Sequence, residues 1–260
     1  MKAEKPERDG INWVREEAIL AFDLYCRIPF RKTKANNPDV ISLSQLLGRT
    51  PASVARKLGN FGSLDPELKK KNISGLGHSS KLDESIWSEF NTNWSALVIE
   101  ANRLRSFRER ILSPATYTPQ MRNLTGKATE RFQVTKQRIY QDFFRQCVLS
   151  GFNQTCCMCG MPHTELLIAS HIIPWSARED TRVNPQNGLC LCASHDMAYE
   201  KGLIGIGIDF SILLGDKAVA SKDAASNFLF GSLVGRKISM PDRFLPSPEF
   251  LSWRLQKFNK

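Results

Sequence analysis

Three of the four histidines and five of the seven cysteines of this 260-residue chain lie between Cys156 and His195. Sulfur and imidazole nitrogen are the ligands that proteins use for zinc, and a neutral imidazole also accepts protons near pH 7. The same part of the chain contains an amide, Asn187, and a carboxylate, Asp196. We therefore expect the chemistry of the protein to lie in this segment.

Two pairs of residues in the segment have the spacing of a zinc site. Two residues separate Cys156 from Cys159, two separate Cys192 from His195, and about thirty lie between the pairs. Each pair can bind one ion through a tight turn, and three thiolates with one imidazole are a common tetrahedral set. We predict a structural zinc that stabilises a small domain with a thin core. The other two cysteines of the segment are assigned to packing; they are Cys157 and Cys190.

From about Arg131 to the C-terminus the sequence resembles the H-N-H nucleases of restriction systems, including McrA-like enzymes that depend on DNA modification. The resemblance covers roughly half of the chain. The stretches that carry it are residues 136–141 with 144–145, the region of Cys156, and residues 170–175, 187–189, 202–204 and 251–254. It implies a ββα-metal fold, in which two short strands and a helix hold a catalytic divalent cation.

The resemblance also implies a role for three residues. The first strand would end at His171, which would be the general base for the attacking water. Asn187 would lie in the connecting loop and position that base, and the helix would open at Cys192. Asp196 lies nine residues after Asn187, at the place of the family's last histidine, and would bind the catalytic magnesium or manganese.

Two positions depart from the family pattern. His195 lies where zinc-containing members have a cysteine, and Asp196 replaces the last histidine. Two assignments therefore stay open for His195: a zinc ligand, which we favour, or a ligand of the catalytic cation, which leaves zinc without a fourth partner. Ser170 occupies the place of the acid that commonly precedes the first histidine, and this weakens the predicted cation site.

The N-terminal half contains a helix-turn-helix pattern. Residues 11–27 have the periodicity of an amphipathic helix. Residues 41–61 predict two short helices joined by a turn, and the second begins with Thr50 as N-cap and Pro51 at its first position. An ordinary helical hairpin with basic decoration is the alternative interpretation. The side chains expected to be exposed on the second helix and to contact DNA are Arg49, Ser53, Arg56, Lys57 and Asn60.

Charge also indicates a nucleic-acid partner. The formal net charge is +10, and residues 101–150 contain ten basic residues against three acidic ones, although a solvated helix surface accounts for this excess equally well. In the helix expected over residues 131–148, Arg138 and Arg145 face outward and are further candidates for contact with the DNA backbone.

Other elements follow from local patterns. Residues 202–215 predict a two-stranded hairpin and residues 246–258 a terminal helix, whereas Trp87 to Leu97 predicts one helix and residues 73–78 a wing around His78. No apolar stretch approaches the roughly 20 residues of a membrane span. The N-terminus lacks the apolar core of a secretory signal, so we expect a cytoplasmic protein, nucleoid-associated when bound to DNA.

The patterns together predict an α+β protein with a helical, helix-turn-helix-like DNA-binding domain at 1–112, a linker at 113–130 and a zinc-containing H-N-H nuclease domain at 131–260. The leading hypothesis is an endonuclease that hydrolyses phosphodiester bonds of double-stranded DNA in restriction or defence, as a homodimer when both strands are cut. The alternative is a zinc-stapled DNA-binding regulator with an inactive H-N-H fold. A homing nuclease is the weaker third hypothesis.

Overall fold

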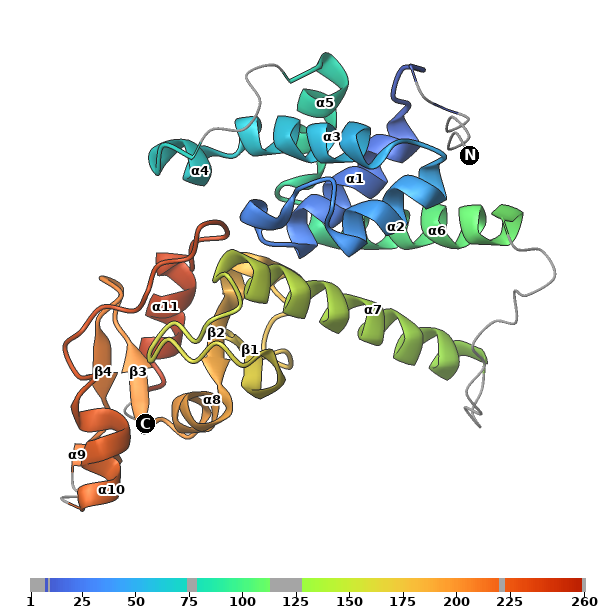
Figure 1. Cartoon of the computed structure of the whole chain (residues 1–260). Coiled ribbons are helices and arrows are strands. Elements are labelled where there is room, and N and C mark those ends of the chain that lie inside the picture. The colour runs from blue at the N-terminus through green and yellow to red at the C-terminus, as the bar shows by residue number, and fades with distance from the viewer. Residues whose placement is uncertain (1–7, 9, 74–78, 113–127, 220–222, 259–260) are drawn as a thin grey trace. The chain divides into compact units, whose positions relative to one another are not determined.

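The computed structural model describes residues 8, 10–73, 79–112, 128–219 and 223–258. The chain forms two compact units, Met1–Phe143 and Phe144–Lys260 (Figure 1). The division at residues 113–130 stays a prediction, and His78, with the wing expected around it, lies outside the described residues. None of the described helices has the length and apolar character needed to cross a membrane.

The first unit is helical. Its helices are α1 (Arg15–Arg27), α2 (Pro38–Leu47), α3 (Pro51–Leu64), α4 (Pro66–Lys70), α5 (Lys81–Phe90) and α6 (Trp94–Leu112), with a 3₁₀ turn at Phe30–Lys32. The next helix, α7 (Ala128–Gly151), contains the boundary between the units. The single helix predicted from Trp87 to Leu97 is wrong, because α5 ends at Phe90 and α6 begins at Trp94.

Helix α1 lies at the centre of the first unit. The ten consecutive residues Glu17–Cys26 are all buried, and α2, α3, α5 and α6 each pack against this helix. A helix buried on every side has no solvated face. The helix predicted over residues 11–27 is therefore confirmed, but its amphipathic character is not, because even Glu17 and Asp23 point into the unit.

The helix pair α2 and α3 has the turn chemistry that the sequence predicts. Gly48 ends α2 with a left-handed φ of 64°, a conformation that glycine adopts without strain. The Thr50 hydroxyl accepts a hydrogen bond from the Ser53 N–H at 3.1 Å, and Pro51 occupies the first helical turn. The two helices are confirmed; that the pair binds DNA stays a prediction.

The exposure predicted for the second helix is wrong at Lys57 of α3 and at Arg49, which lies just before the helix. The Arg49 guanidinium lies 2.6 Å from Glu17 of α1, and the Lys57 ammonium lies 2.6 Å from Asp83 of α5. Their side chains are only 2% and 5% exposed, because a buried carboxylate needs a counter-charge. Of the other predicted contacts, Ser53 and Asn60 are half-buried and only Arg56 is exposed.

Removing the Lys57 charge should destabilise the first unit. Burial raises the pKa of Asp83, but the hydrogen bond and charge of Lys57, together with hydrogen bonds from Ser80 and Asn60, outweigh this effect and hold the pKa below its ordinary value. Lys57→Met leaves that carboxylate buried without its cation, so we expect a loss of about 3 kcal/mol at pH 7. Amide hydrogen exchange in α3 and α5 measures it. Arg56→Met is the matched control and should change stability by less than about 0.5 kcal/mol; equal effects of the two substitutions would contradict the buried pair.

The second unit contains two small sheets and a helix that packs on them. Strands β1 (Leu167–His171) and β2 (Gly188–Cys192) are antiparallel, and α8 (Ala193–Glu200) follows β2 directly. α8 packs on β1, β2 and β3. The other elements are a second antiparallel pair, β3 (Ile204–Ile206) and β4 (Ile212–Leu214), then α9 (Asp216–Val219), α10 (Ala224–Ser226), a π-helix at Asn227–Gly231 and α11 (Pro248–Leu255), with 3₁₀ turns at Thr164–Leu166 and Pro185–Asn187. The predicted hairpin over residues 202–215 and the terminal helix are confirmed.

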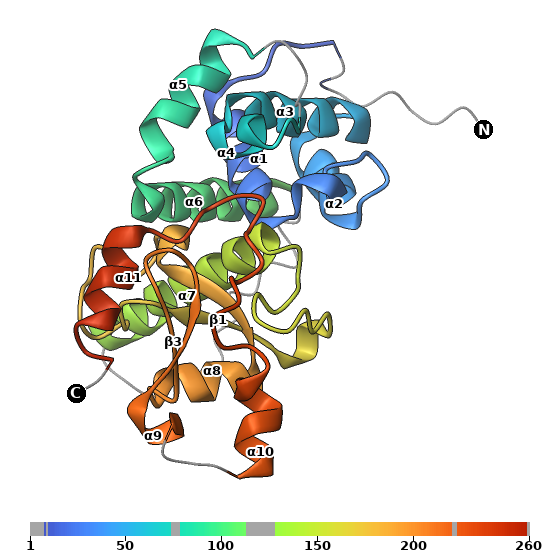
Figure 2. The ribbon, with the colours of Figure 1, turned by 90° about the vertical axis from the view of Figure 1, so that its left-hand side faces the viewer.

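The last turns of α7 and the helix α8 lie on opposite sides of the β1–β2 hairpin (Figure 1, Figure 2). α7 packs closely on the hairpin at Gly188, because a Cβ atom at that position would overlap the side chains of Val148 and Phe144. Phe144, Val148, Leu189 and Leu191 belong to one buried cluster with the cysteines. The hairpin is thus held on both faces, and its two ends have fixed positions in the unit.

Candidate active site

Four of the predicted metal ligands come together at one end of the hairpin. The ligand atoms of Cys156, Cys159, Cys192 and His195 all lie within 4.8 Å of one another. His195 Nδ1 is 3.2 Å from Cys192 Sγ and 3.5 Å from Cys156 Sγ, and the sulfurs of Cys159 and Cys192 are 4.0 Å apart. In the described residues this is the one group of three or more histidine, cysteine or acidic ligands so placed.

Local backbone structure explains how each pair of ligands is presented. Cys156 and Cys159 lie in a tight turn in which Gly160 N–H donates to the Cys156 carbonyl at 2.8 Å, and Gly160 takes a positive φ of 76°. Cys192 is the N-cap of α8, and His195 lies in the first turn of that helix. A turn and a helix start therefore face each other, each with two ligands.

The distances fit a tetrahedral ion. Metal–ligand bonds of about 2.3 Å to sulfur and about 2.0 Å to nitrogen place two sulfurs about 3.8 Å apart, and a sulfur and a nitrogen about 3.5 Å apart. The separations of the four side chains, from 3.2 to 4.0 Å where they are closest, are close to these values. The cluster can thus hold a metal ion, and His195 contributes to it through Nδ1.

His171 lies at the opposite end of the hairpin, as expected for the last residue of the first strand. It pairs with Gly188, whereas Leu167 pairs with Cys192. The imidazole stacks on the ring of Phe144, with centroids 3.7 Å apart and planes 10° from parallel, and meets Trp175 edge-on at 5.8 Å. Two aromatic side chains therefore limit the orientation of this ring.

A backbone carbonyl determines which nitrogen of His171 is free. Nε2 lies 3.0 Å from the Arg182 carbonyl oxygen, which only accepts hydrogen bonds, so Nε2 carries the proton and Nδ1 keeps its lone pair. Burial lowers the pKa of His171 below its ordinary value of 6.5, and the contact with the Arg182 carbonyl offsets part of this effect. The ring is therefore neutral at pH 7, with Nδ1 ready to accept a proton.

Asn187 joins the two ends of the loop between the strands. Its side-chain oxygen accepts from the Ile173 N–H at 2.8 Å, and its amide nitrogen donates to the carbonyls of Ile173 at 3.0 Å and Thr181 at 3.3 Å. The residue is fully buried. These bonds hold the loop that carries the Arg182 carbonyl, the hydrogen-bond acceptor of His171 Nε2.

Asp196 of α8 and Ser170 of β1 both carry side-chain oxygens. Asp196 is half-buried in the first turn of α8. The Ser170 hydroxyl is buried and has no hydrogen-bond partner in the described part of the chain. No hydrogen bond or ion pair joins His171 to Asp196 among the described residues, and their convergence on one cation stays a prediction. Magnesium commonly takes few protein ligands and completes its shell with water and phosphate, which fits this sparse set.

The remaining residues singled out in the sequence divide into buried and exposed groups. Cys157 and Cys190 are buried outside the ligand cluster, as expected, and His163 is exposed. Arg138 and Arg145 are exposed on α7, but Arg145 also donates to the Leu167 carbonyl at 2.8 Å. The stacking of Phe144 on His171 was not predicted, because the place of Phe144 in a hydrophobic helix face gives no sign of it.

A hairpin whose first strand ends in an oriented histidine, followed at once by a helix that packs on both strands, is a ββα arrangement. Residues 147–207 match the family model described as HNH endonuclease. The match contains both strands and α8 and confirms the resemblance seen in the sequence for the C-terminal half of the chain. It is consistent with an H-N-H nuclease. No curated protein matches the chain.

Proposed function

We propose that this protein is a divalent-cation-dependent endonuclease that hydrolyses phosphodiester bonds of double-stranded DNA. The observation that carries the proposal is the His171 imidazole at the end of β1, neutral and with Nδ1 free, inside the region that matches HNH endonuclease. An imidazole held in this way by Phe144 and the Arg182 carbonyl is suited to remove a proton from water.

In the proposed reaction His171 Nδ1 takes a proton from a water molecule as its oxygen forms a bond to phosphorus. The bond from phosphorus to the 3′ oxygen breaks, the 5′-phosphate keeps the new hydroxyl, and the leaving oxygen takes a proton from solvent water to become the 3′-hydroxyl. Asp196 would hold magnesium or manganese, which would neutralise charge on the phosphate and on the leaving oxygen. The Asn187 side chain keeps the loop, and with it the Nε2 partner of His171, in place.

The Cys/His cluster is proposed to bind structural zinc. Three thiolates and one imidazole, all inside the unit except the exposed Cys159, match the ligands of closed zinc sites. Such a site leaves His195 on zinc and gives the catalytic cation to Asp196. The zinc would stabilise the hairpin and α8, because Cys192 ends β2 and His195 lies in the first turn of α8.

The N-terminal unit is proposed to select the DNA site, with residues 1–112 as a DNA-binding domain, 113–130 as a linker and 131–260 as the nuclease domain. The exposed Arg56, Arg138 and Arg145 are suited to phosphate contacts, whereas Arg49 and Lys57 are occupied by buried carboxylates. A cytoplasmic role in restriction or defence, dependence on DNA modification, and a homodimer for double-strand cleavage follow only by analogy with H-N-H nucleases.

Incubation of the purified full chain with supercoiled plasmid tests the proposal. We expect relaxed circles, and linear DNA where two units act, with added magnesium or manganese and none without added divalent cation. Gel electrophoresis over a time course measures both products. Intact plasmid at every magnesium and manganese concentration, on methylated and unmethylated DNA alike, would refute the nuclease.

The pH dependence of cleavage should report the environment of His171. A general base must be unprotonated, and the pKa of His171 is lowered from 6.5 by burial, so the rate should fall only below pH 6.5. The nearby Arg182 guanidinium donates a hydrogen bond to the Trp175 carbonyl and forms an ion pair with Glu179. The logarithm of kcat/KM against pH measures the acid-side midpoint. A midpoint above 6.5 would exclude His171, in this environment, as the base.

A DNA-binding regulator with an inactive H-N-H fold is the second candidate, and two residues favour it. Ser170 and Asp196 stand where the resemblance implies an acid and a histidine, and they leave the catalytic cation with few protein ligands. A regulator would bind plasmid DNA in a mobility-shift assay and leave it intact with magnesium. It would also keep its metal in the Cys/His cluster.

A further inference from the structure

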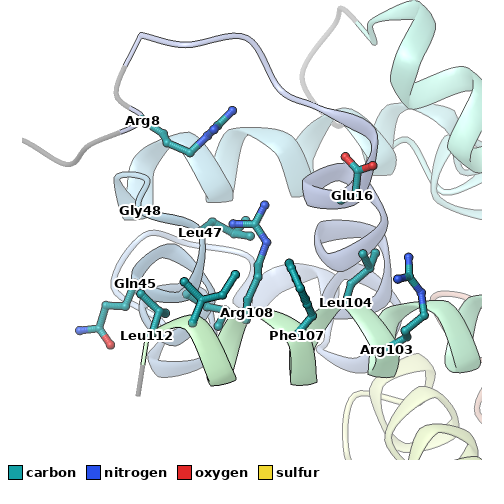
Figure 3. A pocket seen from close by; sticks show the side chains of 12 residues that line it. Arg8, Glu16, Gln45, Leu47, Gly48, Arg103, Leu104, Phe107, Arg108 and Leu112 are labelled. Carbon is teal, nitrogen blue, oxygen red and sulfur yellow. The ribbon is translucent and has the colours of Figure 1, made fainter. Parts of the chain in front are cut away.

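The first unit contains a pocket of about 610 Å³ that the nuclease chemistry does not use. It lies between α1, α2 and α6 (Figure 3). Leu104, Phe107 and Ile111 of α6 form an apolar wall, and Leu47 of α2 adds to it. The charged side chains that line the pocket are Arg8, Arg103, Arg108 and Glu16.

Positive charge is in excess beside this pocket. The fully buried Glu17 carboxylate lies 2.6 Å from Arg49, 2.7 Å from Arg8 and 3.8 Å from Arg108. One buried carboxylate thus faces three guanidiniums, an excess of two positive charges, and Glu16, which also lines the pocket, reduces that excess to one. Gathering like charges at the edge of a low-dielectric interior is unfavourable unless a further anion compensates them.

Two of the three guanidiniums have capacity for an anion. The Arg49 guanidinium is already hydrogen-bonded, since besides pairing with Glu17 it donates to the carbonyls of Ile11 and Asn12. Arg8 and Arg108 line the pocket with side chains 30% and 23% exposed. In the described part of the chain, the Arg108 guanidinium has the 3.8 Å ion pair with Glu17 and no other partner. The Arg103 guanidinium at the rim is already paired with Glu100 at 2.6 Å.

An exposed aromatic ring lies next to these cations. Phe107 is 60% exposed, although a large apolar side chain at that position gains nothing from water contact. Figure 3 shows Phe107 and Arg108 side by side, projecting from α6 into the same space. A guanidinium binds phosphate through paired N–H donors, and an aromatic face stacks on a nucleobase. The pair therefore matches a phosphate that is attached to a flat ring.

The chain's own flanking segments do not supply such a ligand. Residues 1–7 contain two lysines and two glutamates, and residues 113–127 contain Arg122 and Lys127 with no acidic residue. Neither segment has a net negative side-chain charge. A negatively charged ligand from another molecule would complement the guanidiniums of the described residues.

From these contacts we infer that the pocket binds one nucleotide unit, with its phosphate between Arg8 and Arg108 and its base on Phe107. The nucleotide is either part of a single-stranded or unpaired stretch of DNA or a free nucleotide. The inference goes beyond the proposed function, which concerns hydrolysis in the second unit; only its DNA source rests on that function.

Binding of short oligonucleotides to the full chain tests the inference. Fluorescein-labelled tetradeoxyadenylate is titrated without added divalent cation, and anisotropy gives the affinity of wild type, Phe107→Leu, Phe107→Trp and Arg110→Gln. Phe107→Leu keeps an apolar side chain but loses the stacking face, so binding should weaken about tenfold. Phe107→Trp should bind at least as tightly as wild type. Arg110 is exposed on the same helix but does not line the pocket, and its loss should change affinity less than twofold.

Competition then identifies the source of the nucleotide. Displacement of the label by dAMP, and not by adenosine, supports a free nucleotide; displacement only by unlabelled oligonucleotide supports DNA. Equal affinities of wild type and Phe107→Leu overturn the inference, as does a glutamate-rich peptide that displaces the label equally well from both. Plasmid cleavage with magnesium is measured separately. If the protein cuts DNA but Phe107→Leu leaves its oligonucleotide affinity unchanged, the nucleotide pocket is refuted and the proposed nuclease function is not.

Discussion

His171→Ala should reduce plasmid cleavage by about 100- to 10,000-fold, the usual contribution of a general base. The substitution removes Nδ1, which the Arg182 carbonyl leaves as the free acceptor of the ring. The imidazole is only half-buried, and although it stacks on Phe144 we expect the variant to stay folded. Initial rates of nicking at saturating magnesium, compared with wild type at equal protein concentration, measure the effect.

His163→Ala is the matched control, because it removes an exposed histidine of the same unit and should leave the rate unchanged. Asn187→Ala gives an intermediate test. It removes the hydrogen bonds to Ile173 and Thr181 but keeps the His171 imidazole. We therefore expect a lower cleavage rate together with faster hydrogen exchange in residues 172–187. Cleavage by His171→Ala at the wild-type rate, with no trace of wild-type protein in the sample, would remove His171 from the mechanism.

Cys156→Ala should release the metal and destabilise the second unit. Structural zinc binding contributes about 10 to 16 kcal/mol in small zinc domains, which is comparable with the whole stability of a domain. Removal of a direct ligand should lower the zinc affinity by more than the roughly 10- to 100-fold that follows removal of a residue that only hydrogen-bonds a ligand. We expect about one zinc per wild-type chain after dialysis, measured by atomic emission, and well under half of that in the variant.

The neighbouring residue supplies the control for this experiment. Cys157 is buried but lies outside the ligand cluster, so Cys157→Ala removes a similar volume and should keep its zinc. Hydrogen exchange in β1, β2 and α8 should be fast in Cys156→Ala and close to wild type in Cys157→Ala. Equal zinc contents in the two variants would show that the four side chains do not form the zinc site.

Much of the second unit, and the start of α3 in the first, could be predicted because their signals are local. The spacing pairs Cys156 with Cys159 and Cys192 with His195, because ligands with two residues between them lie in one turn. The structure brings the two pairs together. Alternation and turn residues likewise predicted the hairpin over residues 202–215, and Thr50 with Pro51 predicted the start of α3. In each case the residues that determine the structure are close in sequence.

The failures involve partners that are distant in sequence. Arg49 and Lys57 have the spacing of exposed helix cations, and nothing near them reveals that Glu17, 32 residues away, and Asp83, 26 residues away, are buried carboxylates. The stacking of Phe144 on His171 joins residues of a helix and a strand that only tertiary packing brings together. Periodicity predicts which face of an element is apolar, but it does not predict which opposite charges meet inside.

The placement of the metal ligands and His171 at opposite ends of one hairpin has a mechanical consequence. β1 runs from Leu167, beside Cys192, to His171, beside Gly188, and at about 3.4 Å per residue these ends lie about 14 Å apart. A tilt of about 5° at the cysteine end moves the other end by about 1 Å over that length, and a misplacement of about 1 Å can cost a hundredfold in rate. Because the hairpin connects the two ends, oxidation of the thiols should also lower the proposed cleavage activity at the His171 end.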